Sequence, residues 1–400
     1  MTEVMTLPPV PGDLRMARAL GPVLLAAAVG LLPFTVFSTF LVPIAAEAGS
    51  GVAALGSLRG LGGLAALAVG AAMAPLLDRL PKQHLAAAGL ALLGVSSVLG
   101  ATGHFLALVA FAVLVGAGTS VLSPAMAAMA ADRFGDGPAA GRAATLVTAT
   151  QSLTAMLAAP LIAVPALLWG WQGNLLAVAV ISFALAAVFL LRRRPVVVTR
   201  PRIGYLDTLR ALGSVAGAVP LLAVALLRTG AFMGYLSYLA AYYDERFSLS
   251  PGVFALVWTL SGGSYFVGNL LAGRVANAAG SWIRPERVLV GGLVVALGAV
   301  VGFYFAPVLP VALALTVVLA ASHATVAACV TTLLVRRCGE LRGAALGISA
   351  AGMSLGVFVG SALGGLGLGL AGYPGAAVVM GVLTVAALAA AVRVGTVASV

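Results

Sequence analysis

The 400-residue sequence contains few charged residues. Only 8% of the residues are Asp, Glu, Lys or Arg, whereas soluble domains average about a quarter. Hydrophobic residues make up 62% of the chain, and its mean hydropathy is +1.13. This composition excludes an ordinary soluble domain and indicates a protein that lies in a lipid bilayer.

Three further scarcities exclude other classes of protein. Lys82 is the only lysine and no Gly-x-x-x-x-Gly-Lys-Ser/Thr loop occurs, so the sequence predicts no ATP motor. Cys329 and Cys338 lie in a predicted span and a predicted cytoplasmic loop, where reducing conditions disfavour a disulfide. Only His323, of three histidines, falls deep in a predicted span, which is too few ligands for an intramembrane metal enzyme. We therefore expect no enzyme, no metal and no cofactor.

Long apolar runs dominate the sequence, and a spanning helix needs about 20 such residues. Twelve runs qualify, at approximately residues 20–45, 52–77, 85–102, 105–130, 144–168, 173–191, 219–243, 252–272, 288–306, 310–334, 345–370 and 375–393. Nineteen of the 22 basic residues fall in the loops and tails on one side of these spans. Arg246 falls on the other side, and Arg59 and Arg228 fall inside spans. By the positive-inside rule, both termini of this multi-pass protein are cytoplasmic, in the cytoplasmic (inner) membrane.

The formal net charge of +11 is spread over short loops and forms no continuous basic face. It therefore predicts attraction to anionic lipid of the bilayer and no binding to nucleic acid.

The predicted spans fall into two halves. Residues 192–218 form a basic cytoplasmic linker between an N-terminal six-helix bundle, residues 1–191, and a C-terminal one, residues 219–400. Asp78-Arg79 and Gly273-Arg274 close spans 2 and 8 and lie 195 residues apart (78 to 273). Gly170-Trp171 and Gly372-Tyr373 precede spans 6 and 12 and lie 202 residues apart (170 to 372). This near-constant spacing predicts two similar bundles related about an axis along the membrane normal.

The loop after span 2 reads Ala74-Pro75-Leu76-Leu77-Asp78-Arg79-Leu80-Pro81-Lys82-Gln83. With the two six-span halves and the long linker, it resembles the major facilitator superfamily, whose signature there is Gly-x-x-x-Asp-Arg-x-Gly-Arg-Arg. Ala74, Pro81 and Gln83 depart from that signature. The resemblance implies an all-α fold of twelve transmembrane helices, a monomer that moves a small-molecule substrate, and a conformational latch formed by Asp78, Arg79 and Arg274.

Spans 4 and 5 compare unevenly with the drug-exporter branch of that superfamily. Many proton-coupled members carry an arginine in span 4, at the position of Ala112 here. Span 5 carries Ala155, Ala159, Pro160 and Ala163, which resembles the glycine-proline motif of antiporters with alanine for every glycine. No carboxylate lies deep in any predicted span. The usual acidic proton carrier is therefore missing.

Buried ionisable residues in spans are functional candidates, and three occur: Arg59, Arg228 and His323. Arg59 is only about 10 Å from the outer end of its span, so it is either a site residue or an anchor that snorkels outward. Spans 1, 4, 7 and 10 line the central cavity in the superfamily, so the resemblance points to Arg228 and His323. The same four helices supply further candidate substrate contacts, namely Thr35, Ser38, Thr119, Tyr235 and Tyr238.

His323 is the candidate for proton coupling, because imidazole is the side chain that titrates near neutral pH. The first functional hypothesis is proton-coupled efflux of amphipathic compounds or metabolites by alternating access. The alternative is transport of a small organic anion that uses Arg228 and Arg59, a permanent cation being suited to such a ligand. A transporter-like sensor is a third, remote possibility.

Overall fold

The computed structural model describes residues 13–73, 80–134, 138–157, 159–191, 205–277 and 284–397, and every element in these ranges is helical. The first half contains α1 (Asp13–Ala19), α2 (Gly21–Val29), α3 (Leu32–Thr39), α4 (Leu41–Glu47), α5 (Val52–Met73), α6 (Lys82–Gly100), α7 (Phe105–Asp132), α8 (Pro138–Met156), a π-helical turn (Ala159–Ala163) and α9 (Val164–Leu191). The second half contains α10 (Tyr205–Ser214), α11 (Ala218–Phe247), α12 (Pro251–Asn277), α13 (Pro285–Tyr304), α14 (Leu309–Cys338), a 3-10 turn (Gly339–Leu341) and α15 (Arg342–Val397).

Ten helices of the described ranges are long and apolar enough to cross a membrane. Two contain a sharp turn. α15 has 56 residues and would be about 84 Å long if straight, far more than the roughly 30 Å hydrocarbon core. It breaks at Gly372, where φ is 64°, and α9 breaks in the same way at Gly170, where φ is 69°. Glycine adopts this left-handed conformation without strain. The prediction of twelve spans stays a prediction.

The first predicted span is divided into three short helices, α2, α3 and α4. Prolines stand near the start of α2 and α3, and Pro43 lies within α4. Because proline donates no backbone hydrogen bond, it interrupts a long helix. The predicted range 20–45 is therefore occupied by a bent span rather than a straight helix.

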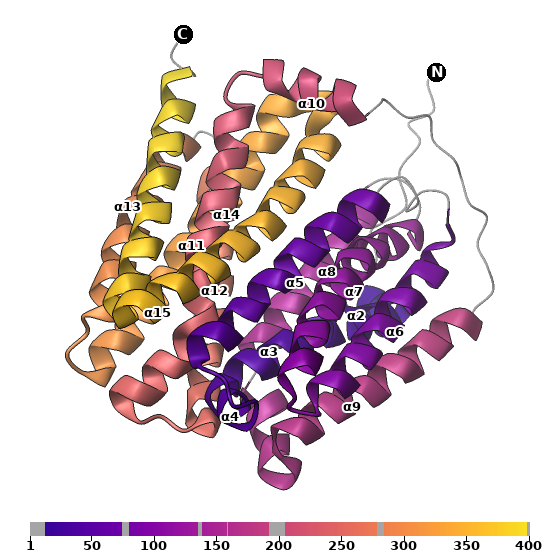
Figure 1. The fold of residues 1–400 in the computed structure, drawn as a ribbon. Helices are drawn as coiled ribbons and strands as arrows, with labels where there is room; N and C mark the ends of the chain where they lie inside the picture. Colours follow the sequence, from indigo (N-terminus) through magenta and orange to yellow (C-terminus); the bar gives the residue numbers. More distant parts are fainter. Residues whose placement is uncertain are drawn as a thin grey trace, which may run out of the picture.

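The helices form two groups (Figure 1). α2–α9 make up the first group, drawn from indigo to magenta, and α11–α15 make up the second, drawn from rose to yellow. The last turns of α15 and α10 lie at one end of the molecule, which we call the terminal face; the opposite end, with α4 and the turn of α15, is the far face. The groups contact each other where α5 packs along α15 and α8 packs along α12.

Close backbone contacts at glycine recur in the two groups. In the first group, Gly116 of α7 lies directly against the carbonyl of Gly62 in α5. In the second, a Cβ on Gly268 of α12 would lie 2.7 Å from the carbonyl oxygen of Ala321 in α14. The two pairs are 206 (62 to 268) and 205 (116 to 321) positions apart. Equivalent helices of the two groups therefore pack through equivalent small residues, which permit close helix approach in membranes.

Candidate functional site

α5 contacts the second group over only part of its length. Its buried residues all lie between Leu55 and Gly63. From Leu64 to Met73 no residue of α5 is buried, and Leu64 itself is 41% exposed. Gly63, the last buried residue of α5, also lies close to the backbone of α15, since a Cβ on it would be 2.7 Å from the carbonyl oxygen of Ser354. The groups therefore touch in the far half of the molecule and separate toward the terminal face, as Figure 1 also shows.

Tyr238 of α11 fills the contact between the groups in the far half. Its hydroxyl donates to the carbonyl of Ser361 in α15 at 2.7 Å and lies 3.4 Å from the carbonyl oxygen of Ala53 in α5. The ring packs against Gly56 of α5 and Gly364 of α15, and the residue is fully buried. Tyr238 thus contacts both groups at their boundary.

A cavity of about 750 Å³ lies on the far side of this contact. Both groups line it, with Val52 and Ala53 from the first and Leu368 from the second. Asp244 and Glu245 add two carboxylates at the end of α11. Ala53 belongs both to the cavity wall and to the contact with Tyr238, so the cavity begins where that contact ends.

Arg59 lies inside the contact region and points toward α3 and α11. Its Nη1 donates to Ser38 Oγ at 3.0 Å, and its Nη2 lies 3.6 Å from the sulfur of Met233. The guanidinium carbon is 5.9 Å from the ring centroid of Phe34. Met233 belongs to the second group, so Arg59 connects the two groups. The side chain therefore contacts neighbouring helices instead of extending to the outer end of α5, and its role as a site residue stays a prediction.

Arg228 of α11 is 4% exposed. Its Nη2 lies 4.0 Å from the sulfur of Met353 in α15, and its Nε has no hydrogen-bond partner among the described residues. A thioether is only a weak acceptor. The guanidinium is therefore buried without an acceptor that matches its charge.

His323 of α14 is 1% exposed and stacks on Phe232 of α11, with ring centroids 4.8 Å apart. Its Nδ1 has no partner among the described residues, which argues against a histidine fixed through that atom by a backbone carbonyl. Arg228 and His323 are both buried within the second group, and their assignment to one site stays a prediction.

The remaining predicted site residues are placed differently. Thr35 and Thr119 bond to carbonyls of their own helices, Leu31 at 2.8 Å and Val115 at 2.8 Å. The hydroxyl of Tyr235 pairs with Thr316 at 2.9 Å in the core of the second group. In this conformation neither Tyr235 nor Tyr238 is available to a ligand, because both rings are buried and both hydroxyls are bonded within the protein. Ligand contacts by these residues stay a prediction.

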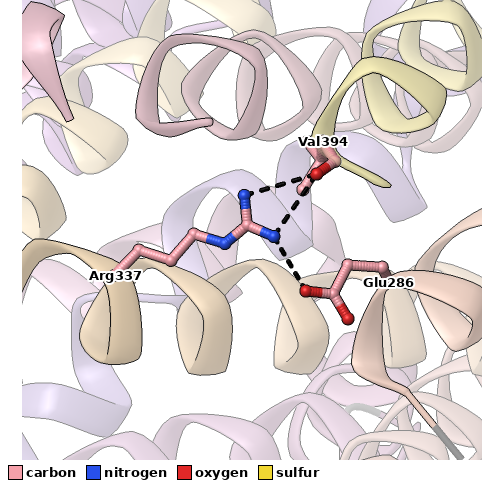
Figure 2. A network of polar contacts seen from close by, with 3 residues as sticks. All are labelled: Glu286, Arg337 and Val394. Carbon is pink, nitrogen blue, oxygen red and sulfur yellow. Dashed lines mark hydrogen bonds and ion pairs between the residues drawn. The ribbon is translucent and has the colours of Figure 1, made fainter. Parts of the chain in front are cut away.

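The predicted latch residues cannot be placed. Asp78 and Arg79 lie outside the described residues, as does the side chain of Arg274, whose backbone lies in α12. Other charges join helix ends at the terminal face. Arg337 of α14 donates to Glu286 of α13 at 2.8 Å and to the carbonyl of Val394 in α15 at 3.3 Å (Figure 2). Lys82 of α6 pairs with Asp132 of α7. Each of these contacts stays within one group.

Sequence reasoning missed Met233, Met353 and Phe232. Phe232 follows Arg228 by four residues and shares its helix face, so helical spacing could have indicated it. Met233 follows by five residues and lies on a different face, so spacing from Arg228 does not indicate it. Met353 lies 125 positions from Arg228, and no local pattern connects the two.

A profile of the Major Facilitator Superfamily matches residues 23–338 and 221–398. The chain belongs to this family. Its members are membrane transporters, so the protein is a multi-pass membrane transporter rather than an enzyme. No curated relative matches the sequence.

Solved structures of low sequence identity share the fold. A bacterial homologue of the human lysosomal transporter Spinster, inward-facing and unoccupied, is 15% identical with a TM-score of 0.71 over 97% of this chain and 96% of that one. A variant of the nucleoside transporter NupG is 13% identical with a TM-score of 0.73 over 94% and 99%. The human organic anion transporter MFSD10 is 17% identical with a TM-score of 0.61 over 96% and 100%.

Proposed function

We propose that this transporter moves a small organic anion across the cytoplasmic membrane by alternating access, with Arg228 as its principal binding group. The observation that carries the proposal is the buried guanidinium of Arg228, which has an unpartnered Nε and only a methionine sulfur at its Nη2. An unpaired charge in a membrane core costs several kcal/mol. A carboxylate accepts two parallel hydrogen bonds from such a fork and offsets that cost.

The orientation follows from the sequence. The terminal face carries α10 with Arg210 and the end of α14 with Arg336 and Arg337, so the positive-inside rule assigns it to the cytoplasm. The conformation described above, in which the groups touch in the far half, is then the inward-facing one. In it an anion would reach Arg228 from the cytoplasm.

Proton-coupled efflux of amphipathic compounds is the second candidate function, and His323 favours it. The imidazole lies about 21 Å along α14 from its far end, it stacks on Phe232, and its Nδ1 has no partner. The imidazole can take up a proton from one side of the membrane and release it to the other side after the two groups change conformation. In this candidate the substrate is apolar or cationic, and Arg228 serves to hold the helices.

Transport in proteoliposomes tests the first proposal. Uptake of labelled benzoate should be lost in Arg228→Ala, because the cation that binds the carboxylate is gone, and in Arg228→Lys, because the planar fork is gone. Arg246→Ala is the matched control, since it removes the same charge from the exposed end of the same helix. The amount of folded protein recovered in detergent should stay close to that of the wild type.

Two outcomes would contradict the proposal. Normal anion uptake by Arg228→Ala would remove Arg228 from the binding site. Efflux of a lipophilic cation by the wild type, with no movement of benzoate or of any other carboxylate, would favour the second candidate.

A further inference from the structure

The two arginines of the membrane core come from opposite groups and share one feature. Arg59 of α5 lies 3.6 Å from the sulfur of Met233, and Arg228 of α11 lies 4.0 Å from the sulfur of Met353. Neither arginine has an ion-pair partner among the described residues. Two positive charges thus lie in the core, each in contact with a thioether and, within the described ranges, paired with no carboxylate.

Neither methionine is buried. From Arg228 to Tyr243, Met233 is the only residue of α11 that is not fully buried, and Met353 is 36% exposed. Methionine is flexible, with three rotatable bonds, and it fills irregular gaps. Both side chains can therefore swing aside and uncover the guanidinium groups without disturbing a packed core.

The two guanidinium groups lie along one stretch of α11. Met233, which marks the position of Arg59, follows Arg228 by five residues, or about 7.5 Å along the helix axis. On the other side, Ser354, next to Met353, meets Gly63 of α5, one helical turn from Arg59. The arginines thus come from opposite sides of the boundary between the groups, and the methionine side chains that they contact lie on α11 and α15.

We propose that Arg59 and Arg228 are two anion subsites for one substrate that carries two anionic groups several bonds apart, and that Met233 and Met353 cover these subsites when the substrate is absent. This inference rests on the proposed function, because it requires an anionic substrate. A monoanion would neutralise Arg228 and leave Arg59 with only Ser38 and a sulfur. A dianion offsets both charges and joins the two groups, so it gains a second charge-assisted contact.

Ligand-induced thermal stabilisation of the purified protein in detergent tests the inference. The probes are unbranched dicarboxylates from succinate to pimelate, the monocarboxylates of equal carbon number, and glycerol 3-phosphate as a compact dianion. The best dicarboxylate should stabilise the wild type at concentrations at least tenfold below those of its monocarboxylate. Stabilisation by glycerol 3-phosphate with none by any dicarboxylate would overturn the two-subsite inference, because both charges of this probe lie on one phosphate group.

Variants separate the two subsites. Arg59→Gln should keep monocarboxylate binding and lose the preference for dicarboxylates, whereas Arg228→Gln should lose both. Met233→Leu and Met353→Leu should retain the preference for dicarboxylates, because these side chains contact the guanidinium groups only when the substrate is absent. Arg246→Gln, at the exposed end of α11, is the control.

The possible failures are distinguishable. Equal potency of mono- and dicarboxylates on the wild type, or an unchanged preference in Arg59→Gln, would overturn the two-subsite inference and leave the proposed function standing. Absence of stabilisation by every anion would overturn both. The comparison on the wild type needs no variant, so a variant that fails to fold does not remove the test.

Discussion

Gly56 of α5 offers a direct way to open the contact that Tyr238 makes in the far half. A Cβ on Gly56 would overlap the Tyr238 ring, with Cδ1 at 2.7 Å and Cζ at 2.9 Å. The ring also lies close to Gly364 of α15, because a Cβ built on that glycine would be 3.1 Å from its Cε2. Gly56→Ala should therefore disfavour the conformation in which the groups touch here.

The magnitude follows from overpacking. Extra methyl groups in a packed core cost about 1–3 kcal/mol. The gain in helix propensity from Gly to Ala applies to both conformations and cancels. When the groups rock apart at the far face, the overlap disappears, so the equilibrium should move toward the far-open conformation by about 5- to 150-fold. Tyr238→Phe removes only the hydroxyl contacts and should shift the equilibrium less, by about 0.5–1.5 kcal/mol.

Distance measurements between spin labels at Ser50 and Glu245, one at the far end of each group, report this equilibrium. The two native cysteines, both buried, are first replaced by Cys329→Ala and Cys338→Ser. Gly56→Ala should increase the population with a long distance. Gly298→Ala is the matched control, since a Cβ there meets nothing within 4 Å. An unchanged distance distribution in folded Gly56→Ala would refute the role assigned to Tyr238.

Three further predictions concern coupling, the latch and the terminal face. His323→Gln should abolish transport driven by a pH gradient and preserve exchange at equal pH, measured with labelled substrate in vesicles. Asp78→Asn should slow interconversion more than it weakens substrate binding, and equal transport rates would contradict this. Arg337→Ala should lower the unfolding free energy by about 1.5–3 kcal/mol, since it breaks a half-buried charged bond. Lys82→Ala removes the more exposed ion pair with Asp132, so it should lower the unfolding free energy by at most about 1 kcal/mol. Thermal unfolding of both variants in detergent measures these changes.

Composition and periodicity were sufficient to predict the fold class. The apolar runs predict an all-helical membrane protein, and the spacing of Gly170 and Gly372 predicts the two positions where α9 and α15 turn back. Both features can be predicted from local sequence, because the length of an apolar run indicates a span and a glycine between two runs indicates a turn. The bend of the first span was not predicted as a set of three helices, although its prolines carry that signal.

The candidate site could be predicted only in part. Arg59, Arg228 and His323 stand out because ionisable residues are rare in apolar spans. Their partners could not be predicted, because Met233 and Met353 are ordinary apolar residues whose role depends on how α5, α11 and α15 pack. Tyr238 shows the same limit. Its depth in span 7 suggests a ligand contact, whereas its place between Gly56 and Gly364 depends on glycines from two other helices.

The division of contacts between the groups indicates which residues respond when the transporter changes conformation. Arg228 with Met353, and Arg337 with Glu286, join helices of one group, so rigid-body rocking leaves them unchanged. The contact of Arg59 with Met233 joins the two groups, so rocking alters it. A ligand shifts a conformational equilibrium only through a difference in its interaction with the two states. Arg228 can therefore hold an anion equally in both conformations, and the conformational response to substrate must come from groups such as Arg59 that the rocking motion moves relative to the ligand.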